Sequence, residues 1–366
     1  MEVQTIELRY FRNYNFLTIK FEPGQNVIWG NNGEGKTSIL EAIYFLALTK
    51  SFKTHFDRDL VKNGENGFKV QGVFCNRKKK ALEIEFRFEL PVDKNILVQG
   101  SPVEKKADIV GLVPVVCLSP DYASITKSGP EERRRWIDLC ISQSDRNYLR
   151  ALIEYRKALK HRNQLLLAAG NPGNVNQTHL ETWNEMLIAN AATIIHKRSE
   201  GIEKIGQLVA TILENIIAAG LKSKIVYRPN ITDTRDLREK LTRNLEMEIN
   251  LGRTLHGPHR DEIDFEFCGK WLRQQGSQGE HKIFLIALKC AEAIYLEDTL
   301  EESPILLLDD IFSELDESRA GQLMIQLRGF GQTFITTTNV KEVPTNPAEK
   351  VNWLKVQNGT IEIKAA

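Results

Sequence analysis

The first third of the chain carries short apolar runs whose spacing predicts strands and then one helix. Three short strands are predicted at residues 3–9, 15–21 and 26–29. After the third strand, the apolar positions take helical spacing over residues 39–47. A small antiparallel sheet and one buried strand are predicted further on, at residues 68–74, 82–90, 95–99 and 114–118.

Long helical patterns dominate the middle of the chain, from about residue 130 to residue 219. They are interrupted at residues 169–173, where glycine and proline predict a turn between helices. A shorter helix-rich segment follows at residues 233–248. Strands and helices then alternate, with strands at 264–267, 305–308 and 333–337 and helices at 278–296 and 317–327.

This order of elements predicts an α/β fold that is interrupted by a helical insertion. Residues 1–120 and 250–366 are expected to form the α/β head, and residues 121–249 a mainly helical second lobe. The chain has 366 residues, 42% of them hydrophobic and 27% charged, which is typical of an ordinary globular protein. The sequence shows no sustained heptad repeat of the kind that forms a long coiled coil.

Charge and cysteine content exclude several classes of protein. The 49 basic and 48 acidic residues nearly cancel, so any DNA-binding surface must be a local patch. The five cysteines form no CxxC pair and have no metal-like spacing. The first residues lack the basic start and apolar core of a signal peptide, and no apolar run reaches the roughly 20 residues that span a bilayer. We therefore expect a soluble cytoplasmic protein without a membrane partner.

The strongest local motif is a full match to GxxxxGK[ST] between a predicted strand and a predicted helix. Its glycines let backbone N–H groups curl around phosphate oxygens, and the helix N-terminus adds partial positive charge. We expect Lys36 to reach the β- and γ-phosphates of ATP as a catalytic group, and Thr37 to bind Mg²⁺. The predicted nucleotide-binding residues are Gly30, Asn31, Asn32, Gly33, Glu34, Gly35, Lys36, Thr37 and Ser38.

Two carboxylates, Asp309 and Asp310, follow the aliphatic run at residues 305–308. An aliphatic run without alternation suits a parallel strand buried on both faces, and ligands bind at the C-terminal end of such strands. We expect Asp309 to hold Mg²⁺ opposite Thr37, and Asp310 to act as the catalytic group that orients and deprotonates the attacking water. About 270 residues separate Lys36 from Asp309, which is too many for a small GTPase or a nucleotide kinase.

A third motif, Gly276 to Glu280, resembles the SxG signature of ABC-type ATPases. In that fold the signature of one subunit caps the γ-phosphate held by another subunit, so Ser277 and Gly279 are expected to contact ATP in trans. Residues 313–316 match the D-loop that crosses the same interface, and Asp316 is expected to lie at the nucleotide. The motifs in this order predict an ABC-type ATPase head that forms a homodimer around ATP.

Segments spread over nearly the whole chain share the pattern of one family: residues 8–14, 21–28, 40–44, 50–53, 119–121, 133–138, 161–163, 257–261, 276–280 and 308–316. In these segments the chain resembles the RecF family of bacterial recombination and repair proteins. The resemblance implies an SMC-like head with a helical second lobe. It also implies an ATP-dependent dimer that binds single-stranded and duplex DNA at gaps or junctions. Partners implied in the same way are RecO and RecR, which the protein would help to load RecA.

Three positions depart from the family pattern. Glu280 ends the signature where the family usually has Gln, and the segment after Asp121, the candidate counterpart of the ABC Q-loop, has diverged. Asp310 stands where most ABC ATPases have Glu. Because a carboxylate one methylene shorter places the attacking water less well, we expect slow ATP hydrolysis.

Three basic clusters are candidates for contact with DNA. The first is the run at residues 77–80, at a predicted hairpin tip, and the second is the run at residues 133–135. The third is Lys157, Lys160 and Arg162 in the helical lobe. Most such runs are solvated faces, so each cluster also has a purely structural interpretation. Because clusters on two subunits add up only in the dimer, DNA binding is expected to depend on ATP and on salt.

Other interpretations are weaker. His256 and His259 have no third ligand at useful spacing, which favours a structural role over a metal site. Arg12 is expected close to the nucleotide. The alternative function is the nucleotide-binding subunit of another ABC-type machine such as a transporter, although the long insertion does not suit that compact head. An SMC-type ATPase with coiled-coil arms would need arms that this chain lacks, and a metabolic kinase would need no signature in trans.

Overall fold

The structure, a computed structural model, describes most of the chain. The described residues are 1–91, 93–171, 176–217, 221–312, 317–327, 329–344 and 351–364. Within these ranges, no helix is both long enough and apolar enough to cross a membrane.

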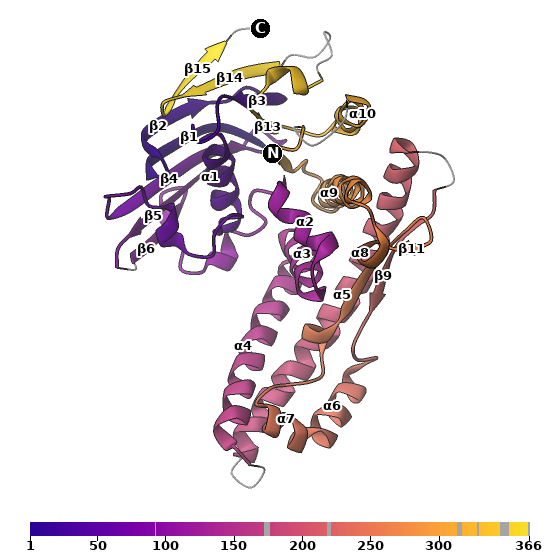
Figure 1. Cartoon of the computed structure of the whole chain (residues 1–366). Helices are drawn as coiled ribbons and strands as arrows, with labels where there is room; N and C mark the ends of the chain where they lie inside the picture. The colour runs from indigo at the N-terminus through magenta and orange to yellow at the C-terminus, as the bar shows by residue number, and fades with distance from the viewer. Residues whose placement is uncertain are drawn as a thin grey trace. The chain divides into compact units, whose positions relative to one another are not determined.

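The chain forms two compact units (Figure 1). The head unit consists of Met1–Ala123, Thr211–Leu221 and Lys282–Ala366. The helical unit consists of Ser124–Ala210 and Lys222–His281. The division expected from the sequence put the signature segment in the head, whereas here that segment falls in the helical unit.

The head unit begins with an antiparallel sheet in the order β2-β1-β4-β5-β6-β7. The rings of Phe68 and Phe86, on two of its strands, pack edge-on against Phe45 of helix α1, with ring centroids 5.7 Å and 4.6 Å away. Side chains alternate between the faces of a strand, so one face of this sheet is covered by the helix. The strands are β1 Glu2–Phe11, β2 Tyr14–Lys20, β4 Gly67–Cys75, β5 Ala81–Glu89, β6 Asp93–Val98 and β7 Ser101–Pro102.

The second sheet of the head unit contains the strand that leads into the P-loop. Its order is β15-β14-β3-β13-β12-β8, and all neighbours are parallel except β15, which runs antiparallel to β14. Every residue of β8, β12 and β13 is buried, as expected for a parallel sheet covered on both faces. The strands are β3 Gln25–Trp29, β8 Val115–Leu118, β12 Ile305–Asp309, β13 Thr333–Thr337, β14 Val351–Gln357 and β15 Thr360–Lys364.

Helix α1 (Lys36–Leu48) lies between the two sheets of the head unit (Figure 1). It contacts β1, β4 and β5 on one side and β8, β12 and β13 on the other. This explains why eleven of its thirteen residues are buried, since a helix covered all round has no polar face. Further helices of this unit are η1 Asp57–Leu60, η2 Lys106–Asp108, η3 Pro120–Tyr122, α10 Glu317–Leu327, η7 Val340–Glu342 and most of α9 Gln278–Leu300.

The helical unit combines long helices with a small antiparallel sheet in the order β11-β10-β9. Its longest helix, α5 (Gln177–Ile216), has 40 residues and is therefore about 60 Å long. The strands are β9 Ser223–Arg228, β10 Glu262–Phe267 and β11 Lys270–Trp271. The other helices are α2 Ala123–Lys127, α3 Pro130–Ser144, α4 Arg146–Ala169, α6 Thr234–Arg243, α7 Leu245–Leu251, η5 Pro258–Arg260 and α8 Leu272–Gln275.

Two buried arginines tie the helical unit together. Arg198 on α5 binds the carboxylate of Asp138 on α3 at 2.8 Å and that of Asp261, beside β10, at 2.7 Å. Burial alone would lower the pKa of Arg198, but these carboxylates raise it well above its ordinary value. Arg162 on α4 binds Glu248 on α7 at 2.7 Å, and both side chains are fully buried. Each network therefore joins segments that are far apart in the sequence.

Most of the elements predicted from the sequence are confirmed, with ends shifted by a few residues. The strands β7, β9, β11, β14 and β15 were not predicted, and the short helices α2 and α8 were also missed. At the predicted turn between the long helices, α4 ends at Ala169 and Gly170 adopts a left-handed φ of 65°. Residues 172–175 of that turn lie outside the described residues.

Candidate nucleotide-binding site

The P-loop connects the end of β3 to the start of α1, as predicted. Two of its glycines are required by close packing. A Cβ atom on Gly35, which has a φ of 106°, would lie 2.5 Å from the side chain of Asn13 and 2.6 Å from the hydroxyl of Tyr14. A Cβ atom on Gly30 would lie 2.3 Å from the carbonyl oxygen of Val356 on β14. Only glycine fits at either position, so neighbouring strands fix the shape of the loop.

The side chain of Lys36 lies back over the P-loop. Its Nζ donates hydrogen bonds to the carbonyl oxygens of Gly30 and Asn31, both at 2.8 Å. Burial lowers the pKa of Lys36, while the nearby charges of Asp310 and Asp309 oppose this shift. The ammonium group is thus held at the mouth of the loop, where it can move to phosphate oxygens.

The two predicted metal ligands, Thr37 and Asp309, are brought into contact. The hydroxyl of Thr37 donates to Oδ1 of Asp309 at 2.7 Å, although the two residues come from opposite ends of the chain. The sheet order explains the contact, since only β13 separates the P-loop strand from the acidic strand and all three strands are parallel. Hydroxyl and carboxylate oxygens are donors that Mg²⁺ prefers, so this pair fits the ion.

Thr336, at the end of β13, links both aspartates. Its hydroxyl donates to Oδ1 of Asp309 at 2.8 Å and accepts from the backbone N–H of Asp310 at 2.9 Å. Asp310 has a φ of 52°, in the left-handed region that aspartate tolerates better than most residues. The sequence predicted the strand but not this role of Thr336, because a buried strand threonine gives no signal of its own.

A second group of charged residues surrounds the loop. The guanidinium of Arg12 forms a fork with the carboxylate of Glu41 on α1, at 2.6 Å and 2.7 Å, so its charge is engaged inside the protein. The hydroxyl of Ser51 donates to the same carboxylate. Two residues further on, Nζ of Lys53 lies 4.0 Å from Asp309. Lys53 therefore adds a cation to the site, and the sequence motifs did not predict this residue there.

The signature segment forms the N-terminal cap of α9 in the helical unit. The backbone N–H of Ser277 donates to the Glu280 carboxylate at 2.6 Å, and the backbone N–H of Glu280 donates to Oγ of Ser277 at 3.3 Å. This reciprocal pair is a capping box, and Gly279 lies between its two members. The hydrogen bonds from Ser277 lower the pKa of Glu280. The side chain at position 280 therefore has a structural role at the start of this helix.

Asp121 and Asp316 were also predicted from the sequence to lie near the nucleotide or the Q-loop. Asp121 lies in η3 directly after β8, an exposed position at the same edge of the parallel sheet as Asp309. Residues 313–316, including the predicted contact Asp316, lie outside the described residues.

His259 has the structural role that the sequence favoured. It is hydrogen-bonded to Tyr155 at 2.7 Å, and burial lowers its pKa to about 4.

The basic clusters are unequal in exposure. Arg162 is fully buried against Glu248, which removes it from the candidates for DNA contact, whereas Lys157 and Lys160 are exposed. The run at residues 77–80 follows β4 in a turn, as predicted.

Among the described residues, no group of His, Cys, Asp and Glu is arranged to hold a metal ion.

The fold and the site define a class. Two sheets enclose a P-loop helix, an acidic strand meets the P-loop, and a signature segment caps a long helix. These are the parts of an SMC-like, ABC-type ATPase head with an inserted helical lobe. The family described as RecF/RecN/SMC N terminal domain matches residues 2–362. Together with the relatives described next, this match shows that the chain belongs to the RecF family.

Several known proteins are similar over their full length. The DNA replication and repair protein RecF of Moorella thermoacetica is 36% identical over 359 residues, covering 98% of this chain and 96% of that protein. RecF of Lachnoclostridium phytofermentans is 34% identical over 362 residues and 99% of each chain. A solved structure of the recombination mediator RecF with ATP, from the RecFOR pathway, has a TM-score of 0.91 and 32% identity, covering 99% of this chain and 97% of that one.

More distant structures share only the fold. The Smc head domain of Pyrococcus furiosus has a TM-score of 0.58 at 17% identity, covering 100% of this chain and 96% of that one. The family assignment favours a repair ATPase over a transporter subunit, which was the alternative from the sequence.

Proposed function

We infer that two copies of this chain form an ATP-dependent clamp on DNA that acts in recombinational repair. The observation that carries this proposal is the 2.7 Å contact between Thr37 and Asp309, which joins the P-loop and the acidic strand into one site. Relatives named as DNA replication and repair proteins support the choice of DNA, and a RecF structure with ATP supports the nucleotide.

Different residues of the head unit bind the phosphates, bind the metal ion and activate the attacking water. Lys36 moves from the carbonyl oxygens of the loop to the β- and γ-phosphates. Thr37 and Asp309 would hold Mg²⁺, which would neutralise charge on the phosphate oxygens. Asp310 orients the attacking water and accepts its proton, while Thr336 fixes the backbone from which this carboxylate projects.

The signature completes the site from a second copy of the chain. Ser277 and Gly279 of one copy cap the γ-phosphate bound by the P-loop of the other, because a helix N-terminus offers N–H groups and a favourable dipole. Asp316, outside the described residues, is assigned to the same interface. Slow hydrolysis removes the γ-phosphate and with it the contact that holds the two copies together.

The biological role follows the family. The dimer binds single-stranded and duplex DNA at gaps or junctions and helps RecO and RecR to load RecA. The similarity to a RecF described as a mediator in the RecFOR pathway supports these partners.

Size-exclusion chromatography with light scattering on the Asp310→Asn protein tests this proposal. With ATP and Mg²⁺ we expect a dimer that retains a gapped duplex, because the variant binds ATP but cannot activate water. Lys36→Met is the matched control, since it removes the phosphate contact and should stay monomeric. A monomer under all conditions, with no DNA retained, would contradict both the trans signature and the clamp.

A further inference from the structure

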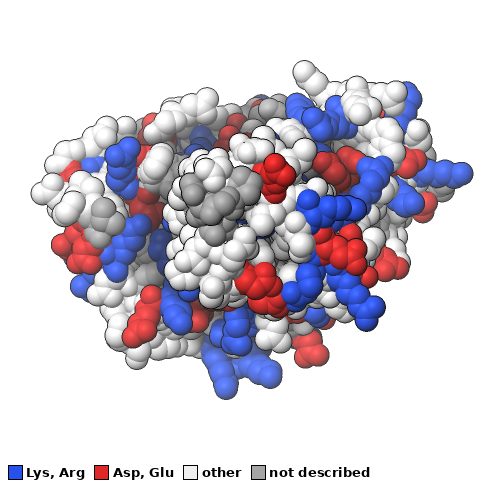
Figure 2. Space-filling model, turned by 90° about the horizontal axis from the view of Figure 1, so that it is seen from below, with Lys and Arg blue, Asp and Glu red and all other residues white. Residues whose placement is uncertain are grey.

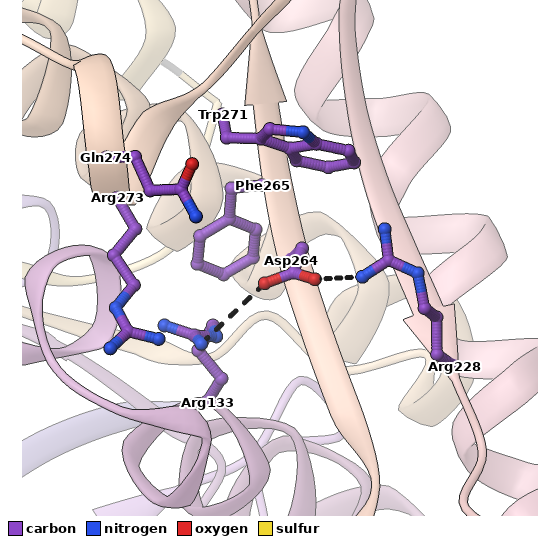
Figure 3. A pocket seen from close by; sticks show the side chains of 7 residues that line it. All are labelled: Arg133, Arg228, Asp264, Phe265, Trp271, Arg273 and Gln274. Atoms are coloured by element: carbon purple, nitrogen blue, oxygen red, sulfur yellow. Dashed lines mark hydrogen bonds and ion pairs between the residues drawn. The ribbon is translucent and has the colours of Figure 1, made fainter.

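A small cavity in the helical unit is lined by more positive charge than its own acidic residue can balance (Figure 3). It has a volume of about 180 Å³. Three arginines contribute to its wall: Arg133 from α3, Arg228 from the end of β9 and Arg273 from α8. Asp264 on β10 is the one carboxylate among its lining residues.

Arg133 is the most unusual of these residues because its guanidinium is buried and incompletely bound. Its side chain is only 1% exposed. Nη1 donates to the carbonyl oxygen of Ser128 at 2.8 Å, but Nε and Nη2 have no hydrogen-bond partner among the described residues. The Asp264 carboxylate lies 3.8 Å from Nη2, beyond hydrogen-bond distance. A buried guanidinium with two unbound donor nitrogens is costly unless an anion reaches it.

The carboxylate of Asp264 is already engaged by another arginine. Arg228 binds it directly, on the side away from Arg133 (Figure 3). Arg273 forms no ion pair within the described part of the chain, and its guanidinium lies beside that of Arg133 in Figure 3. Burial lowers the pKa of Arg133, Asp264 opposes this shift, and the charge of Arg273 lowers it further. The pair of arginines therefore forms a place where an anion would relieve repulsion.

The size and chemistry of the cavity limit the anion. A volume of about 180 Å³ is below the roughly 300–1,000 Å³ of pockets that enclose whole ligands, so the cavity takes one group of a larger molecule. Guanidinium groups bind phosphate with paired hydrogen bonds. Trp271, which is 36% exposed, supplies an aromatic surface at the same cavity, and Arg228 lies 5.2 Å from its ring centroid. Aromatic rings beside arginines are typical of surfaces on which nucleic-acid bases stack.

We propose that this cavity binds one phosphate of a nucleic-acid strand between Arg133 and Arg273, with Trp271 against the adjoining base or sugar. The inference rests on the proposed binding of DNA and names a surface for it. On the face of the molecule shown in Figure 2, basic and acidic side chains are interspersed, and the net charge of the chain is +1. One phosphate site with fixed geometry gives such a surface a defined contact, which scattered basic side chains would not give.

A pair of matched variants tests the site. Arg273→Gln removes an exposed charge at the cavity, and Arg238→Gln removes an exposed charge from α6 of the same unit, where Arg238 is paired with Glu185 at 2.8 Å. Binding of a labelled gapped duplex and of a single-stranded oligonucleotide is measured over a salt series, with and without ATP and Mg²⁺. We expect Arg273→Gln to bind about tenfold more weakly and to reduce the salt slope by about one, with Arg238→Gln within about twofold of the parent.

Crosslinking locates the contact independently of affinity. An oligonucleotide that carries 5-iodouracil is irradiated with the full chain, and the modified peptide is identified by mass spectrometry. A crosslink at Trp271 that is lost in Arg273→Gln supports the site. Trp271→Ala should weaken binding of the single strand by about tenfold, because one stacked base contributes on that order.

The outcomes separate this inference from the proposed function. If DNA binding depends on ATP but is equally affected in Arg273→Gln and Arg238→Gln, the clamp stands and the phosphate site is wrong. If binding is independent of ATP yet falls only in Arg273→Gln, the site stands and the clamp is wrong. Loss of binding to a partner protein in Arg273→Gln, with DNA binding unchanged, overturns the nucleic-acid assignment. A parent chain that binds no DNA overturns both.

Discussion

The hydroxyl of Thr336 contacts both aspartates at the end of the acidic strand. It donates to Asp309 and accepts from the backbone of Asp310, at 2.8 Å and 2.9 Å. The left-handed φ of 52° at Asp310 is uncommon outside glycine, and such a conformation persists only where neighbours hold it. The backbone from which the predicted catalytic carboxylate projects is therefore held in part by a threonine on the neighbouring strand.

We expect Thr336→Val to reduce single-turnover ATP hydrolysis by at least about tenfold, because the two hydrogen bonds that it loses contribute roughly 0.5–1.5 kcal/mol each. ATP affinity should change less than about threefold, since the P-loop is untouched. Thr333→Val, at the other end of the same buried strand, is the control. Equal rates for the two variants would show that Thr336 does not position Asp310.

At the scale of elements, the start of α9 has two functions: its residues cap the helix, and they are proposed to contact ATP. Ser277 and Glu280 cap each other, which satisfies N–H groups that the first turn of a helix leaves unbound. The carboxylate that does this carries negative charge at the helix end that is proposed to meet a phosphate. The cap therefore stabilises the helix in one copy while opposing the approach of nucleotide from the other.

We expect Glu280→Gln to dimerise at about fivefold lower ATP concentration, since it keeps a side-chain acceptor for the cap and removes roughly 1 kcal/mol of repulsion. Light scattering against ATP concentration measures this. Asp298→Asn makes the same change of charge on the exposed far end of α9 and should have no effect. A dimer that forms less readily in Glu280→Gln would mean that the carboxylate assists the contact.

The elements of the nucleotide site could be predicted because each lies in one continuous segment. The P-loop, the aliphatic strand before Asp309 and the signature each carry their chemistry within a few residues. The cavity of the helical unit could not be predicted in this way, because Arg133 and Arg273 come from elements about 140 residues apart and no local spacing relates them. The run that contains Arg133 was noted as basic, but the sequence does not show which of its arginines is buried.

At the scale of the whole molecule, buried ion pairs join segments of the helical unit that are far apart in the sequence. Asp138 and Asp261 were noticed only as parts of family segments, and the structure shows that both bind Arg198 on α5. The role of Arg198 could not be predicted, since one arginine in a 40-residue helix resembles any solvated charge. Its network joins α3, α5 and the turn before β10.

We expect Arg198→Met to lower the free energy of unfolding of the helical unit by about 3–5 kcal/mol, because two buried carboxylates lose their common partner. Chemical denaturation followed by circular dichroism measures the change. Lys197→Met, at the neighbouring and more exposed position, should cost less than about 1 kcal/mol. Equal stability of the two variants would show that the network contributes little.

The strand order of the head also has a consequence for how the protein is made. Among the described strands, β3 pairs with β13 and β14, and both are synthesised about 300 residues after it. A ribosome adding roughly 5–20 residues per second needs on the order of 15–60 s to pass from β3 to β13. Throughout that interval the nascent chain carries a P-loop strand with two open edges, which chaperones and proteases can recognise. Binding of nucleotide thus becomes possible only after β13 and β14 have been synthesised, so a chain that terminates before β13 would lack it.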